Sequence, residues 1–192
     1  GELTPTPLGV ATRRIARLVN PELSQRMEAA VATFSSAIHD MAPGRIDYLD
    51  DELGTYLTAL RDAATAARSD INPSPADPKA AAARNEALAA LTEIAETAAR
   101  VLDSFGPAIP DRTDVVWLDQ EETRPAPAGR SEATRGSAPA VRPVLRVAPL
   151  SVAGLLQSRL FEGSTAVLTS ATLTIGGSFE AMAQAWGLAD GP

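Results

Sequence analysis

The strongest constraint on the fold is an apolar pattern that repeats every three or four positions through residues 1–105. This period places apolar side chains on one face of an α-helix. Helices are predicted over about 7–19, 21–41, 47–69 and 78–105. Short or proline-marked connections between four such helices indicate an antiparallel bundle. We therefore predict a mainly α fold in which residues 1–109 form a helical bundle with the apolar stripes as its core.

Proline also marks where these helices begin. A polar residue followed by proline favours a helix start, because proline at the first helical position loses no hydrogen bond. The chain has three such pairs in the right places, Thr6-Pro7, Asn20-Pro21 and Asp77-Pro78. Asp51 and Glu52 lie in the first turn of the third helix, where negative charge is favourable.

The pattern changes after residue 109. Residues 113–118 read as a β-strand, and residues 144–147 read as its partner. The segment between them, about 122–140, is rich in Pro, Gly, Ser, Ala and Arg and has no apolar period, which is typical of a disordered loop. We therefore predict a strand pair with this loop at its tip over residues 110–150.

The last part of the chain, residues 151–192, predicts an α/β arrangement. Ser151 is expected to cap a helix that continues to about Phe161, and Ser178 a final helix. Between them, residues 165–168 form a short apolar run bounded by turn-forming residues, which indicates a strand buried on both faces. A strand–helix fragment of this size cannot complete a sheet, so we expect its neighbouring strands to come from elsewhere.

Two hydroxyl side chains follow this predicted strand. Ser170 and Thr172 flank Ala171, at the strand end where open α/β sheets place functional groups. The simpler alternative is that these hydroxyls only satisfy backbone amides of a turn or a helix cap.

Charge is unevenly distributed along the 192 residues, whose formal net charge is −7. Residues 1–46 carry five bases against four acids, residues 47–122 six against sixteen, and residues 123–192 six against four. An acidic middle excludes a broad basic clamp for nucleic acid. There are no cysteines, so neither disulfides nor a cysteine-bound metal can form within the chain. We find no signal peptide or apolar span and expect a soluble, cytoplasmic protein. The first residue is not methionine, so we also expect a piece of a longer protein.

Chemical motifs of a self-contained enzyme are missing from the sequence. A Walker A phosphate loop requires lysine, and the single lysine, Lys79, follows a proline at a predicted helix start. Asp51-Glu52 lies in a leucine-periodic helix and reads as a helix start. His39 has no second ligand or nucleophile nearby in the sequence, so a surface role is the simpler interpretation.

Arginine and tryptophan offer weaker signals for nucleic-acid binding. Arg13 and Arg17 share a helix face and could meet phosphates, although a solvated face paired with nearby acids is the simpler interpretation. Trp117 and Trp186 could stack on bases, although packing on a strand face and on a helix stripe is the better explanation.

The order of elements after residue 115 carries a resemblance. A tryptophan-bearing strand, Ala148-Pro149-Leu150, a helix, a strand, Thr169-Ser170-Ala171-Thr172-Leu173, a helix and Gly187-Leu188 follow one another. This order resembles the DinG/XPD-like family of ATP-dependent helicases, in which Ser170-Ala171-Thr172 would be motif III. Ala171 favours the bacterial DinG side, because some XPD relatives carry glycine at this position.

The resemblance implies a fold and a function. Residues 1–109 would be the helical arch inserted before motif III, and residues 110–192 would return to the first RecA-like motor domain. The intact parent would unwind DNA in repair or replication, with single-stranded DNA and the remaining motor domains as partners. Ser170 and Thr172 would couple nucleotide state to DNA binding. The Walker motifs, ATP and Mg²⁺ would lie outside this chain, and the iron–sulfur cluster of some relatives stays undecided. The alternative is a non-enzymatic helical module that binds a protein partner.

Overall fold

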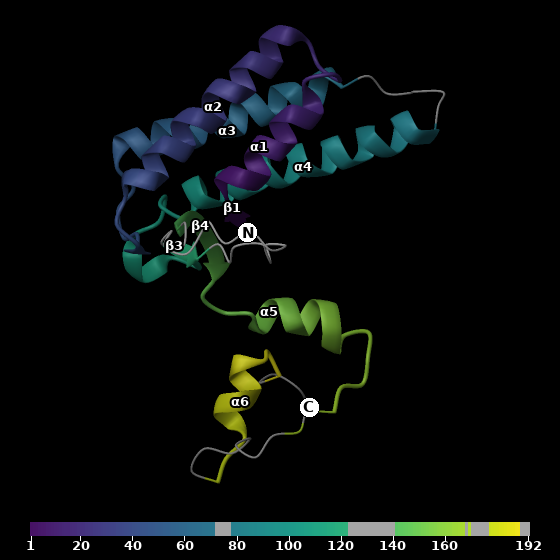
Figure 1. The fold of residues 1–192 in the computed structure, drawn as a ribbon. Coiled ribbons are helices and arrows are strands. Elements are labelled where there is room, and N and C mark those ends of the chain that lie inside the picture. The colour runs from purple at the N-terminus through teal and green to yellow at the C-terminus, as the bar shows by residue number, and fades with distance from the viewer. Residues whose placement is uncertain (72–77, 123–140, 168, 170–176, 189–192) are drawn as a thin grey trace, which may run out of the picture. The chain divides into compact units, whose positions relative to one another are not determined.

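The computed structural model describes residues 1–71, 78–122, 141–167, 169 and 177–188 (Figure 1). The chain forms two compact units, unit 1 over Gly1–Ala148 and unit 2 over Pro149–Pro192. Unit 1 contains four long helices and a small sheet, and unit 2 contains short helices. The mainly helical prediction is therefore confirmed.

The four long helices of unit 1 are α1 (Pro5–Ile15), α2 (Pro21–Asp40), α3 (Asp51–Asp70) and α4 (Pro78–Asp103). Helix α2 begins as predicted, and the Asn20 side chain accepts a hydrogen bond from the Glu22 amide at 2.9 Å. Helix α3 begins at Asp51 because Asp50 caps it, accepting from the Leu53 amide at 2.7 Å.

The first helix begins two residues earlier than predicted. The cap position is Thr4 and not Thr6, and Pro5 occupies the first helical position. The sequence Thr4-Pro5-Thr6-Pro7 offers two equivalent starts, and both prolines are compatible with the first turn. Leu3 is almost fully buried, which fixes the chain entering the helix at the earlier of the two.

Unit 1 also contains a four-stranded antiparallel sheet in the order β1-β4-β3-β2. The central strands are β3 (Asp114–Glu122) and β4 (Val141–Pro149), which confirms the predicted strand pair. The two edge strands are β1 (Glu2–Leu3) and β2 (Gly44–Arg45), and neither was predicted. In register, Leu3 lies opposite Leu145 and Arg45 opposite Trp117. Two-residue strands leave no period in a sequence, which is why both escaped detection.

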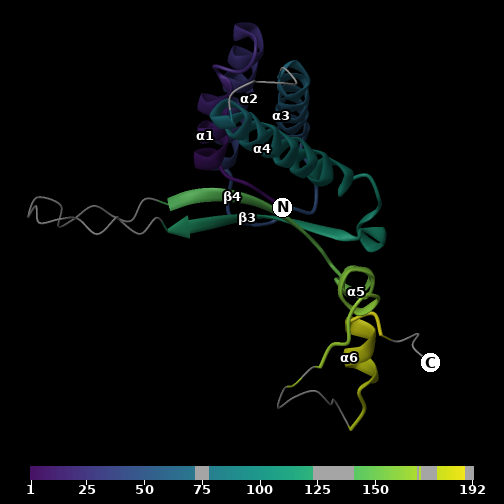
Figure 2. The same ribbon diagram turned by 90° about the vertical axis from the view of Figure 1, so that its right-hand side faces the viewer.

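The sheet and the helices share one core. Figure 2 shows the helices gathered on one side of β3 and β4. Alternate sheet residues point toward them, namely Val116 and Leu118 from β3 and Leu145 and Val147 from β4. These side chains join Phe34, Leu57, Leu91 and the other buried apolar residues of the helices in one continuous cluster. Each fully buried large apolar side chain contributes about 1.5–3 kcal/mol relative to an exposed one.

Unit 2 contains α5 (Ala153–Leu156), a π-helical continuation over Gln157–Phe161, and α6 (Glu180–Ala185). Both helices lie where the sequence predicts them. The predicted buried strand over 165–168 is wrong for residues 165–167, which form no strand and are exposed, Val167 by 85%. Residue 168 lies outside the described residues. A central parallel strand needs a hydrogen-bonded neighbour on each side, and the described residues supply none at this position.

Candidate functional site

The predicted site residues Ser170, Ala171 and Thr172 lie outside the described part of the chain. The structure describes the helices on either side of them. The Ser151 hydroxyl accepts from the Ala153 amide at 3.3 Å before the first of these helices. The Ser178 hydroxyl accepts from the Glu180 amide at 3.1 Å before the second. The cap positions themselves are Val152 and Phe179, one residue after the serines that the sequence predicted.

A close backbone approach joins the helices that flank the site. Gly187 has φ +74°, a left-handed conformation that glycine adopts without strain. A Cβ atom at this position would collide with the carbonyl group of Ala153 and press on Gln157. The end of α6 therefore lies against the start of α5, and residues 162–178 connect two helices that touch each other. Gly187 belongs to the Gly-Leu pair of the resemblance, but its backbone role was not predicted.

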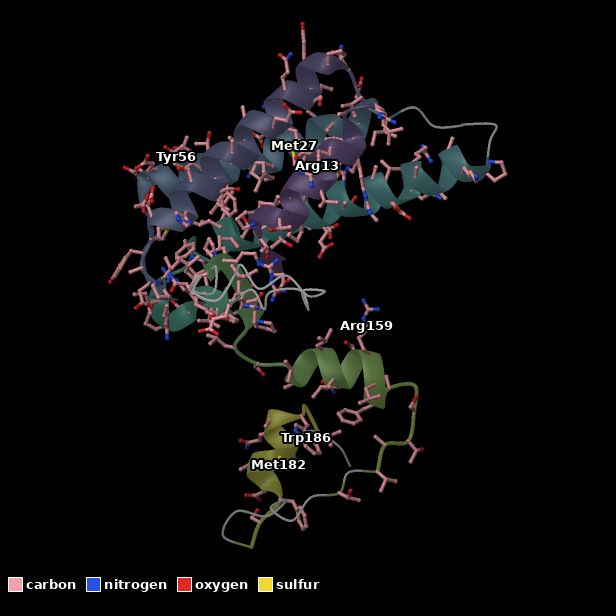
Figure 3. All side chains as sticks on the ribbon, in the orientation of Figure 1. Arg13, Met27, Tyr56, Arg159, Met182 and Trp186 are labelled. Carbon is pink, nitrogen blue, oxygen red and sulfur yellow. The ribbon has the colours of Figure 1, made fainter. Side chains whose placement is uncertain are left out.

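Apolar side chains cover the surface of unit 2. Its exposed large apolar residues are Leu150, Val152, Leu155, Leu160, Val167, Phe179 and Leu188. No described residue of this unit is buried. Trp186 (Figure 3) is only half-buried. Clusters of exposed apolar side chains mark surfaces that bind another part of a protein or a partner.

In unit 1 a bidentate ion pair attaches helix α4 to strand β3. Arg100 Nε lies 2.9 Å from Asp114 Oδ2, and Arg100 Nη2 lies 2.6 Å from Asp114 Oδ1. The hydrogen bonds from Arg100 hold the pKa of Asp114 below its ordinary value, and burial opposes this shift only in part. The same pair raises the pKa of Arg100. Parallel hydrogen bonds of this kind fix orientation as well as distance.

A second charged network joins three strands of the sheet. Arg146 on β4 contacts Glu2 on β1 at 2.8 Å, and it contacts Glu121 and Asp119 on β3. Arg142, four residues earlier on β4, contacts Glu121 at 2.7 Å. The network holds the two-residue edge strand β1 in register by its side chain as well as by its backbone.

These two networks were missed by the sequence analysis. Arg100 and Asp114 are separated by 14 positions, and Glu2 and Arg146 by 144. Single-sequence patterns detect neighbours within a helix or strand, and long-range pairs of common residue types leave no such signal. His39 is exposed, as its simpler interpretation predicted. Asp51 and Glu52 begin α3, which confirms the predicted helix start, and Lys79 lies exposed in the first turn of α4.

Similarity to known proteins covers the whole chain. It is 60% identical over all 192 residues to curated proteins named ATP-dependent helicase DinG, from Mycobacterium tuberculosis and from Mycobacterium bovis. The resemblance to DinG-like helicases is confirmed. The chain spans 27% of the length of these relatives, so it corresponds to a segment of a DinG-like protein.

The DinG-like segment matches no protein-family model, and no solved structure matches it significantly. None of its described helices is both long and apolar enough to cross a lipid bilayer. Within the described ranges, no group of three or more His, Asp or Glu side chains is arranged to bind a metal ion.

Proposed function

We propose that this chain is a segment of an ATP-dependent DNA helicase, in which residues 1–109 act as the arch domain and residues 170–172 as motif III. The single observation that carries the proposal is the 60% identity over the whole chain to ATP-dependent helicase DinG. The sequence order from Trp117 through Ala148-Pro149-Leu150 to Gly187-Leu188 supports the same assignment, although the strand expected within it is not formed at 165–167.

The connections of unit 1 support the role of an inserted arch. The chain enters the bundle through β1 and leaves it through β4, and these strands are hydrogen-bonded neighbours. The amide of Val147 donates to the Gly1 carbonyl, and the Gly1 ammonium donates to the Val147 carbonyl at 2.9 Å. A domain with adjacent ends can be inserted into a loop of another domain without separating the parts on either side.

The surface of unit 2 supports the assignment to a motor domain. Its exposed leucine, valine and phenylalanine side chains lack a covering layer among the described residues. In a RecA-like domain, the remaining strands and helices would cover them. The partners that follow from the proposal are the rest of the motor domains and single-stranded DNA.

Ser170 and Thr172 would couple nucleotide state to DNA binding in this parent. Hydroxyl groups both donate and accept hydrogen bonds, so each can exchange partners as a neighbouring group changes charge. They position other groups and perform no bond cleavage themselves. An element with two conformations can link ATP hydrolysis to strand movement if both ATP and DNA shift the balance between these conformations.

The ATP and Mg²⁺ of the reaction do not fit the described residues. Phosphoryl transfer requires a phosphate-binding loop, a metal-binding acid and a charge-stabilising arginine. Lys79 is exposed on the first turn of α4, and the described acids form no metal-binding group. We therefore propose that both are held by parts of the parent outside this chain.

The test uses the full-length parent carrying Ser170→Ala and Thr172→Ala together. DNA-stimulated ATP hydrolysis is expected to continue, while unwinding of a tailed duplex is lost. Ser158→Ala is the matched control, because the Ser158 hydroxyl donates to the Gly154 and Leu155 carbonyls of its own helix and, among the described residues, to no other group. If the double variant unwinds DNA as well as the control, the coupling role is disproved.

A further inference from the structure

Unit 1 carries its positive and negative charge at opposite ends. We define its distal end as residues 11–30, 61–71 and 78–90, and its proximal end as its remaining described residues. At the distal end, the Asn20 amide donates to Asp70 Oδ2 at 2.7 Å, and Arg14 lies 3.3 Å from Glu86. At the proximal end, β2 follows α2 directly and pairs with β3. In Figure 1 the distal end lies away from β3.

The count of charged residues differs sharply between the two ends. The distal residues include eight bases and five acids, and the described proximal residues include five bases and fourteen acids. Helix α3 has 20 residues, so its own two ends are about 30 Å apart. Because the Debye length is about 10 Å at 0.1 M salt, acids near the first turn of α3 contribute little to the potential near its last turn.

Four arginines at the distal end, Arg13, Arg17, Arg26 and Arg68, form no ion pair with a described residue. Arg14 pairs with Glu86, but within the part of the chain that the structure describes, Arg13 and Arg17 form no ion pair. Both are exposed, and they lie four positions apart on one side of α1 and the turn that follows it. The expectation that nearby acids pair with them is therefore wrong among the described residues.

The Arg13 side chain (Figure 3) lies on the same face of α1 as Gly9, one turn earlier. A Cβ atom at Gly9 would be 3.6 Å from Arg13 Nη1, so the guanidinium lies in van der Waals contact over the glycine.

We infer that Arg13 and Arg17 bind consecutive phosphates of single-stranded DNA. Guanidinium groups form paired, charge-assisted hydrogen bonds with phosphate oxygens. Two unpaired arginines spaced by one helical turn match a repeating polyanion better than a single ion. The choice of DNA over another polyanion rests on the proposed function.

The test measures binding of fluorescein-labelled oligothymidylate to the 192-residue chain by fluorescence anisotropy, at roughly 50 to 200 mM salt. Each phosphate contact with a single strand contributes about 0.7 to the slope of log affinity against log salt. The Arg13→Gln/Arg17→Gln variant should lower that slope by about 1.4, equivalent to roughly 25-fold in affinity at 0.1 M salt.

The control removes the same charge from arginines that already have acidic partners. Arg45 lies 2.8 Å from Asp47, and Arg61 lies 2.9 Å from Asp62. Arg45→Gln/Arg61→Gln should leave the slope nearly unchanged, and Arg13→Lys/Arg17→Lys should retain most of it. Far-ultraviolet circular dichroism confirms that each variant is folded.

Three results would overturn the inference. The first is an equal loss of salt slope in the two glutamine variants. The second is the absence of salt-dependent binding by the unmodified chain. The third is displacement of the labelled DNA by polyglutamate as effectively as by unlabelled oligothymidylate at the same charge concentration. Each is independent of the Ser170 and Thr172 experiment. If the Ser170 and Thr172 variant loses unwinding while the two glutamine variants have equal salt slopes, only the DNA contact at Arg13 and Arg17 is disproved.

Discussion

Unit 1 contains a continuous cluster of buried apolar side chains, whereas no described residue of unit 2 is buried. The two units have similar helix-forming sequences, so propensity alone does not separate them. The difference is in what each helix packs against. Unit 1 has partners for all four long helices and for its sheet, and unit 2 exposes the apolar faces that such partners would cover. A segment can therefore carry a complete fold and an incomplete one in a single chain.

The test that changes the chain most is the removal of unit 2. A chain of residues 1–148 should unfold cooperatively, with a free energy of unfolding within about 0.5 kcal/mol of the full chain, because no core residue is lost. Chemical denaturation followed by circular dichroism measures this. The peptide 149–192 should show little stable structure alone. A loss of several kcal/mol on truncation would mean that the units stabilise each other.

A matched pair of leucines sharpens the comparison. Leu57 is fully buried in α3, and Leu155 in α5 is 57% exposed. Leu57→Ala should reduce the free energy of unfolding by about 2–5 kcal/mol, because it leaves a cavity in the core. Leu155→Ala should cost less than about 0.5 kcal/mol in this chain. In the full-length parent the Leu155 change should become costly if the motor domain covers it, and urea denaturation of both proteins compares the two.

Gly187 tests whether unit 2 holds together through its backbone contact. Gly187→Ala introduces a Cβ at φ +74° that collides with Ala153, at a cost of about 1–3 kcal/mol. In the full-length parent, where the motor domain is proposed to cover unit 2, amide hydrogen exchange should become faster in α5 and α6, with no change in unit 1. Gly163→Ala is the control, because its added Cβ would have no neighbour within 4 Å. Unchanged exchange in the Gly187 variant would show that the approach contributes nothing.

The smallest expected effect concerns the ion pair within unit 1. Asp114→Asn should cost about 1 kcal/mol, the upper end for a partly exposed pair, since Arg100 remains 40% exposed. Arg100 lowers the pKa of Asp114 below 3.8, so this stabilisation is present above that pH. It is lost as the pH falls through the lowered pKa of the folded state.

Thermal denaturation at several pH values measures this difference. The two proteins should differ at pH 6 and converge in strong acid, where the carboxyl of the unmodified chain is also neutral. Asp62→Asn is the comparison, because its arginine partner is adjacent in sequence and both side chains are exposed. If the stability loss of Asp114→Asn stays the same in strong acid, the loss comes from altered packing and not from the ion pair.

Much of unit 1 was predictable because its signals are local. The apolar period located four helices, and Asn20 and the acids before Leu53 indicated where two of them begin. Strands β1 and β2 were not predictable, because two residues carry no period and their pairing depends on partners far along the chain. The Arg146 network escaped for the same reason, since Glu2 and Asp119 are ordinary acids in the sequence.

In unit 2 the sequence predicted the helices, placed each cap one residue too early, and was wrong about the strand at 165–167. An apolar run indicates that a segment is suited to a buried position. Burial in a sheet also requires neighbouring strands, which the run itself does not supply. The site residues Ser170, Ala171 and Thr172 stay a prediction based on motif order. No local physical signal distinguishes their hydroxyls from those of an ordinary turn.

The pairing of β1 with β4 has a consequence for how such a chain can be edited. Leu3 and Leu145 lie opposite each other in the antiparallel pair, so their Cα atoms are roughly 5 Å apart. Residues 4–144 therefore connect two positions that are neighbours in the sheet. A two-residue turn spans that gap, so a shortened protein could pass directly from β1 to β4. Such a deletion would remove β2 and β3 together with the helices, and only the β1–β4 pair of the sheet would remain.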